Sequence, residues 1–159
     1  MTPETVAPVR KQIVVNASQE HVFKVFTRDI NTWWPREHHI GTSPLAQAML
    51  EPHAGGRWYA ICEDGSECDT GKVLAWDPPR RLVLAWQITA QWQFDPEFVT
   101  EVEVNFVADG PKTTTVTLEH RNLARYGVAA EAFRASIDAA GGWGKLLESL
   151  ARRAEEAAP

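Results

Sequence analysis

The chain has 159 residues, a formal net charge of −5, 44% hydrophobic residues and 23% charged residues. This length and composition predict a single globular domain over residues 1–159, ordered from about residue 8 to residue 157. The acidic balance argues against a nucleic-acid partner, because affinity for a phosphate backbone requires clusters of lysine and arginine that this sequence lacks.

The sequence also contains no candidate for a membrane span. No stretch approaches the ~20 consecutive apolar residues of a membrane-spanning helix. The first residues lack the basic region and the apolar segment of a signal peptide. We therefore expect a cytoplasmic protein without a membrane span.

Alternating and helical patterns predict the elements at the start of the chain. Residues 9–15 alternate as in a strand, and Ser18 is a good N-cap for the helix that follows. A second short helix is predicted over residues 29–34, because Pro35 disfavours helical geometry in the residue before it. A polar loop over residues 36–46 then leads to a short strand over residues 47–51.

Five further strands are predicted in the middle of the chain. Each is separated from the next by Asp, Gly or Pro residues that favour turns. They cover residues 57–63, 68–76, 81–89, 98–107 and 113–120. With the strand over residues 9–15 and the short strand over residues 47–51, the prediction is about seven strands.

The two cysteines flank the turn between two of these strands. A three-residue turn centred on Gly65 would place Cys62 opposite Cys68, which would make a disulfide geometrically conceivable. A two-residue Asp64-Gly65 turn would instead place Cys62 opposite Glu67. The cytosol keeps such pairs reduced, so we expect two free thiols and no metal site at this turn.

The last third of the chain returns to a helical pattern. One helix is predicted over residues 129–139, and Gly141-Gly142 either kinks it or separates it from the final helix. The final helix has apolar residues at helical spacing, namely Trp143, Leu146, Leu147, Leu150 and Ala151. Such a helix needs an apolar partner, and a curved antiparallel sheet would supply one. The sequence thus predicts an α+β fold in which about seven antiparallel strands wrap around a long C-terminal helix, with two short helices after the first strand.

Several local signatures occur along nearly the whole chain in a familiar order. They are Val22-Phe23, Trp33-Trp34, Gly55-Gly56-Arg57-Trp58, residues 77–86, residues 114–120, and Gly142-Trp143 with Leu146-Leu147. In this order the chain resembles the START-like, or SRPBCC, superfamily, and within it the AHSA-type bacterial proteins homologous to the activator of the heat-shock chaperone ATPase. The resemblance implies the helix-grip fold and a ligand cavity between sheet and terminal helix. The superfamily includes lipid carriers, aromatic cyclases and chaperone activators, so the resemblance does not imply one function.

Seven tryptophans are many for a chain of this length, and the fold would direct several of them inward. Indole rings either fill the core or surround a cavity, because ligand sites are mostly apolar with few polar groups. The expected ligand-binding residues are Trp34, Trp58, Trp86, Trp92, His120, Phe133 and Trp143.

Histidines are the candidate polar groups. His120 shares the parity of Val116 and Leu118, so it should point inward and offer a ligand one polar anchor; a structural histidine bonded to backbone at the strand end is the alternative. Glu37-His38-His39 invites a metal or acid-base interpretation, but no third metal ligand is placed. We therefore expect a solvated loop that could gate the cavity, and no metal or cofactor.

Glu101 and Glu103 alternate with apolar residues, which places both carboxylates on the solvent face and argues against a paired-carboxylate active site. No nucleophile motif, phosphate-binding glycine loop or dinucleotide fingerprint is present. The leading hypothesis is therefore a non-enzymatic protein that binds a small hydrophobic or aromatic molecule.

Two other functions remain open from the sequence. One is a cyclase-like or hydrolase-like enzyme for an aromatic or polyketide-like substrate, with His120 or His38 as general acid or base. The other is activation of a heat-shock chaperone through the outer face of the sheet. A homodimer through edge strands or the exposed sheet face is also possible.

Overall fold

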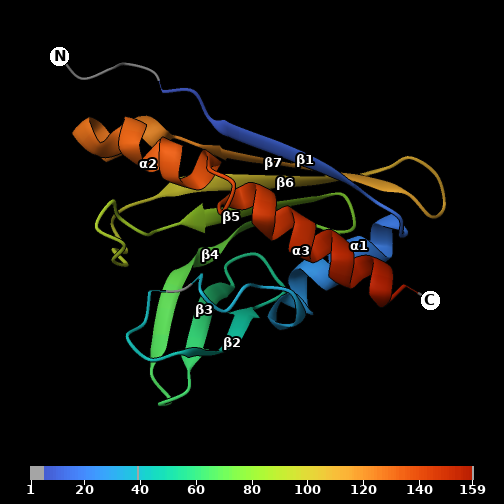
Figure 1. The fold of residues 1–159 in the computed structure, drawn as a ribbon, viewed down its shortest axis with the longest axis horizontal. Helices are drawn as coiled ribbons and strands as arrows, with labels where there is room; N and C mark the ends of the chain where they lie inside the picture. Colours follow the sequence, from blue (N-terminus) through green and yellow to red (C-terminus); the bar gives the residue numbers. More distant parts are fainter. Residues whose placement is uncertain (1–5, 39, 159) are drawn as a thin grey trace.

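A computed structural model describes residues 6–38 and 40–158 of the chain. It contains a seven-stranded sheet in the order β1-β7-β6-β5-β4-β3-β2, in which every neighbouring pair is antiparallel (Figure 1). The strands are β1 (Val9–Val15), β2 (Leu45–Leu50), β3 (Arg57–Cys62), β4 (Glu67–Asp77), β5 (Arg81–Trp86), β6 (Thr100–Ala108) and β7 (Thr114–Arg121). The predicted α+β fold with seven strands is confirmed.

Five helical segments accompany the sheet in the described part of the chain. They are α1 (Gln19–Thr27), the short 3-10 helices η1 (Ile30–Thr32) and η2 (Leu123–Ala129), α2 (Ala130–Asp138) and α3 (Trp143–Glu156). The predicted cap is confirmed, because the Ser18 hydroxyl accepts a hydrogen bond from the His21 amide. The predicted second helix over residues 29–34 is shorter than expected, since only residues Ile30–Thr32 form a 3-10 turn.

The glycine pair separates two helices and does not kink one. A Cβ atom on Gly142 would lie 2.1 Å from the carbonyl oxygen of Ile137, so only glycine lets the chain pass this close to the end of α2. The 3-10 segment η2 was not predicted. Gly127 interrupts it with φ of 61°, a left-handed conformation that breaks the helical periodicity.

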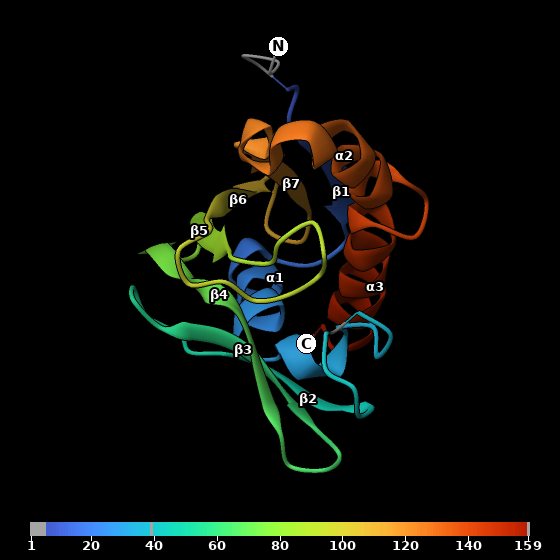
Figure 2. The same cartoon turned by 90° about the vertical axis from the view of Figure 1, so that its left-hand side faces the viewer.

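The sheet curls around α1 and α3, as the predicted helix-grip arrangement requires (Figure 2). Helix α3 packs against β1 and α1, and Leu150 and Ala154 on its inner face are fully buried. This face is apolar at helical spacing, which explains why the helix lies against the concave side of the sheet. None of the described helices is both long and apolar enough to cross a bilayer.

The turn between β3 and β4 corrects one prediction about the cysteines. Glu67 lies opposite Ile61 and not opposite Cys62, whose amide bonds to the Ser66 carbonyl at 2.8 Å. The turn spans three residues, 63–65, and places Cys62 opposite Ser66, so neither of the two expected registers occurs. Both cysteines are free thiols, as predicted.

The outer face of the sheet is charged, as the alternation of β6 predicted. The guanidinium of Arg121 pairs with Glu101 at 2.8 Å and with Glu103 at 2.5 Å, and Arg81 pairs with Glu103 at 2.8 Å. The hydrogen bonds from Arg81 and Arg121 lower the pKa of Glu103 to about 2. These carboxylates are part of an ion-pair ladder on the outer face, and neither of them lines the cavity on the inner side of the sheet.

Candidate functional site

A cavity of about 480 Å³ opens between the start of α3, the end of α2 and the loops that follow η1 and β5. This volume lies in the range of small-molecule sites. Four indoles, of Trp34, Trp86, Trp92 and Trp143, form much of its wall. Aliphatic contact comes from Ile40, Ile88, Ile137 and Leu146, and polar side chains come from Glu37, His38, Thr70 and Ser136.

Several of the indole rings pack against one another in edge-to-face arrangements. The ring centroids of Trp86 and Trp143 are 5.7 Å apart, and those of Trp34 and Trp143 are 6.5 Å apart. Trp58 lies 5.8 Å from both Trp34 and Trp86 and connects them from behind. Because the rings of Trp34, Trp86 and Trp143 are each held by two or more others, this part of the wall offers a rigid apolar surface to a flat molecule.

Not all of the expected ligand-binding residues face this cavity. Trp34, Trp86, Trp92 and Trp143 line it, whereas Trp58 supports the wall from behind. Phe133 lies behind Trp86 and Trp92, with ring centroids at 6.4 and 5.3 Å. His120 points inward as predicted, but its side chain is fully buried behind Trp86 and Trp143.

The buried His120 is held by side chains on both ring nitrogens. The indole N–H of Trp143 donates to Nδ1 at 3.1 Å, so the ring proton is on Nε2, which donates to Thr100 Oγ1 at 2.8 Å. Burial lowers the pKa of His120 to about 3, and the ring is therefore neutral at physiological pH. His120 thus fixes the orientation of one cavity wall.

One indole of the wall carries an unpaired donor. Nε1 of Trp86 is buried and has no hydrogen-bond partner among residues 6–38 and 40–158. The nearby Tyr126 hydroxyl donates to the Ile88 carbonyl at 2.8 Å, and burial raises the Tyr126 pKa. The region behind the cavity is therefore a buried core that holds both a paired hydroxyl and an unpaired indole donor.

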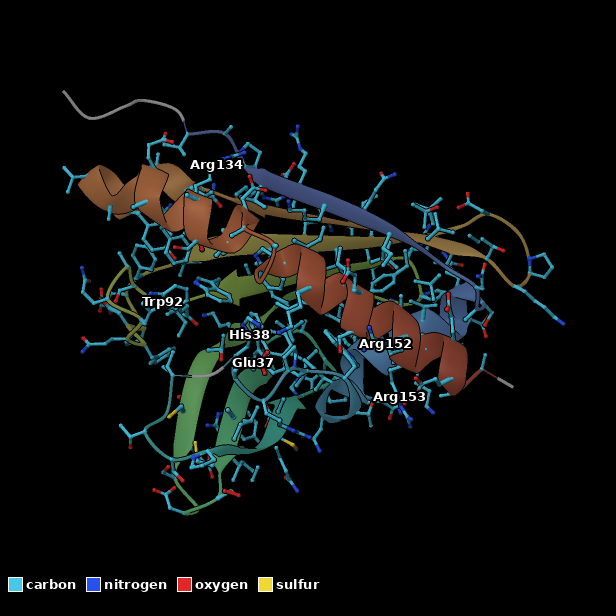
Figure 3. The ribbon with its side chains drawn as sticks, in the orientation of Figure 1. Glu37, His38, Trp92, Arg134, Arg152 and Arg153 are labelled. Carbon is cyan, nitrogen blue, oxygen red and sulfur yellow. The ribbon has the colours of Figure 1, made fainter. Side chains whose placement is uncertain are left out.

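The loop after η1 brings the accessible titratable groups to the cavity. Glu37 pairs with Lys145 of α3 at 2.7 Å, and the Trp34 indole donates to the His38 carbonyl at 2.7 Å. The hydrogen bond from Lys145 lowers the pKa of Glu37, and burial lowers that of His38, so its imidazole is neutral at pH 7. Figure 3 shows Glu37 and His38 on this loop and Trp92 on the loop after β5. His39 lies outside the described residues.

Sequence reasoning missed several cavity residues. Thr70 lies two residues after Cys68 on β4 and so points to the same, inner face of the sheet, which could have identified it. No local sequence pattern marks Ser136 or Ile40 as cavity residues. Trp92 has a positive φ of 60°, unusual for a bulky residue, and this bend directs the loop after β5 to the cavity rim. Within the described part of the chain, no group of three or more potential ligands could hold a metal ion.

Comparison with known proteins agrees with this architecture. A solved structure described as an anthrahydroquino-gamma-pyrone synthase, Txn09, complexed with SUM is 39% identical, covering 94% of this chain and 98% of that chain, with a TM-score of 0.66. The self-sacrificing resistance protein CalC from Micromonospora echinospora is 33% identical, covering 96% of both chains, with a TM-score of 0.70. No protein with a curated description matches.

A more distantly related solved structure shares the fold. It is CalU16 from Micromonospora echinospora, which is 20% identical, with a TM-score of 0.58, over 91% of this chain and 71% of that chain. The family described as Activator of Hsp90 ATPase homolog 1-like protein matches residues 16–155, which include every strand from β2 to β7, the helices before α3 and all but the last residue of α3. The chain therefore belongs to the Activator of Hsp90 ATPase homolog 1-like family.

Proposed function

We propose that this protein binds a planar, polycyclic aromatic molecule in the cavity between the sheet and helices α2 and α3. The observation that carries the proposal is the set of four indoles around a space of about 480 Å³. Flat rings stack well on rigid indoles, and few polar groups compete for the space. The 39% identical relative is described as an anthrahydroquino-gamma-pyrone synthase, which supports a ligand of this shape.

Replacing Trp92 with alanine is expected to weaken binding of 2-ethylanthraquinone by roughly two- to tenfold, the value of one aromatic contact of about 0.5–1.5 kcal/mol. Trp92 is 46% exposed, so its loss should change the free energy of unfolding little. Fluorescence quenching or calorimetric titration measures the affinity.

Trp76→Ala is the matched control, because Trp76 packs against Phe23 and does not line the cavity. Its affinity for the same probe should equal that of the unmodified protein. A Trp92→Ala protein with unchanged affinity, beside a correctly folded control, would contradict the proposed site.

A second candidate function is catalysis on such a ligand, with His38 as general acid or base. Two observations favour it: His38 is the described histidine that borders the cavity, and the 39% identical relative is described as a synthase. His120 is unsuited to direct proton transfer, because it is fully buried and both of its ring nitrogens are already bonded. Chaperone activation has support only from the family description.

If His38 is a general acid or base, a variant that lacks its imidazole should still bind the ligand but should convert it much more slowly. His38→Gln should lower kcat for an anthrahydroquinone substrate by about 100-fold or more, the usual contribution of a general acid or base. Affinity for 2-ethylanthraquinone should remain within about twofold, since glutamine keeps a polar side chain at the rim. Single-turnover absorbance measurements give the rate, and equal rates in both proteins would exclude His38 chemistry.

A further inference from the structure

A second, much smaller cavity of about 20 Å³ adjoins the main one beside β3 and β4. The two cavities share Trp34, His38, Ile40 and Thr70 as walls, and the small one continues toward Trp58 and Cys68. Its volume is enough for one water molecule or one hydroxyl group, but not for a ring. It is therefore a narrow side pocket of the main cavity.

Two polar side chains border this side pocket with unused hydrogen-bonding capacity. Neither the Thr70 hydroxyl nor the His38 imidazole bonds to another side chain or to backbone in the described part of the chain. The Thr70 carbonyl is already used, because it accepts from the Gln87 amide at 2.9 Å. A hydroxyl and a neutral imidazole each offer one donor and at least one acceptor, so together they can satisfy a hydroxyl or a carbonyl oxygen.

The remaining walls exclude a charged group. Trp34, Trp58 and Ala60 are at least nine-tenths buried and apolar, and an ion placed against them would lose its hydration without a counter-ion. Burial also raises the pKa of the Cys68 thiol, which keeps that neighbour uncharged. The pocket therefore suits a neutral oxygen.

We propose that the side pocket is an oxygen subsite, in which a hydroxyl or carbonyl oxygen of the ligand bonds to Thr70 Oγ1 and to the His38 imidazole. The inference rests on the proposed function and narrows its ligand class to polycyclic aromatics with a neutral oxygen substituent at one edge. The rings then lie among the indoles of the main cavity while the oxygen enters the side pocket. His38 is held in place for this contact by the Trp34–His38 hydrogen bond and the Glu37–Lys145 ion pair.

Two probes of equal shape test the subsite, 2-(hydroxymethyl)anthracene and 2-ethylanthracene, which differ by a hydroxyl in place of a methyl group and carry no other oxygen. The unmodified protein should bind the hydroxyl probe about fivefold more tightly, as one net hydrogen bond of about 1 kcal/mol requires. Thr70→Val keeps the shape of the side chain and removes its hydroxyl. In that variant the preference should fall to less than about twofold, as measured by calorimetric titration of both probes.

Thr117→Val is the matched control, because Thr117 of β7 lies on the outer face of the sheet and borders a different groove. It should keep the fivefold preference. Equal affinities of the two probes in the unmodified protein, or an unchanged preference in Thr70→Val, would overturn the subsite while leaving the proposed function intact. If neither probe binds the unmodified protein, the proposed function fails and the subsite fails with it.

Discussion

Gly71→Ala is expected to lower the free energy of unfolding by about 3 kcal/mol or more, the upper end of overpacking effects. Gly71 pairs with Trp58 of β3 and Trp86 of β5 in the sheet. A Cβ atom there would lie 1.7 Å from the carbonyl oxygen of Ala85, so the backbones of β4 and β5 would have to separate. Urea denaturation followed by circular dichroism measures the loss.

Gly144→Ala is the matched control for this substitution. Gly144 lies in the first turn of α3, and a Cβ atom on it would meet no atom within 4 Å. Alanine is favoured over glycine in a helix by about 0.5–1 kcal/mol, so this variant should be slightly more stable than the unmodified protein. Equal stability of the two alanine variants would contradict the close packing of β4 against β5.

The second large effect is expected at His120 when the pH falls. Its pKa is about 3 in the folded chain and about 6.5 in an unfolded one, so between these values only the unfolded state binds the extra proton. The neutral, buried His120 therefore makes its full contribution to stability above about pH 6.5. As the pH falls from there toward 3, the free energy of unfolding decreases by about 1.4 kcal/mol per pH unit. Urea denaturation between pH 7 and pH 4.5 measures this slope, above the range in which most carboxylates titrate.

The variant His120→Leu separates the pH dependence caused by His120 from that of the other titratable groups. At pH 7 the variant should be less stable by roughly 2–4 kcal/mol, because the Trp143 indole N–H and the Thr100 hydroxyl lose their buried partner. The difference from the unmodified protein should shrink toward pH 4.5, since leucine binds no proton. His38→Gln is the control, because His38 is only half-buried and its removal should leave most of the slope. If the free energy of unfolding changed with pH equally in His120→Leu and in the unmodified protein, His120 would not be the group that causes the pH dependence.

The strands and the terminal helix were predictable because their signals are local. Turn residues bound each strand, alternation assigns its two faces, and the Ser18 cap starts α1. The errors lie where the chain does not follow its local pattern. Residues 29–34 form only a short 3-10 turn, and β5 ends at Trp86, three residues early, because the chain bends into a loop closed by the Ile88–Phe94 bridge.

The sequence by itself determined which residues point inward, and His120, Trp58 and Trp86 are all buried as predicted. Only the tertiary structure decided which of them border the cavity. Trp86 lines it while His120 lies behind Trp86 and Trp143, because parity assigns a face of the sheet and not the layer that neighbouring elements place over it. Thr70, the loop with His38 and the loop with Trp92 meet at one cavity through contacts between distant segments, and no periodicity within a segment encodes such a meeting.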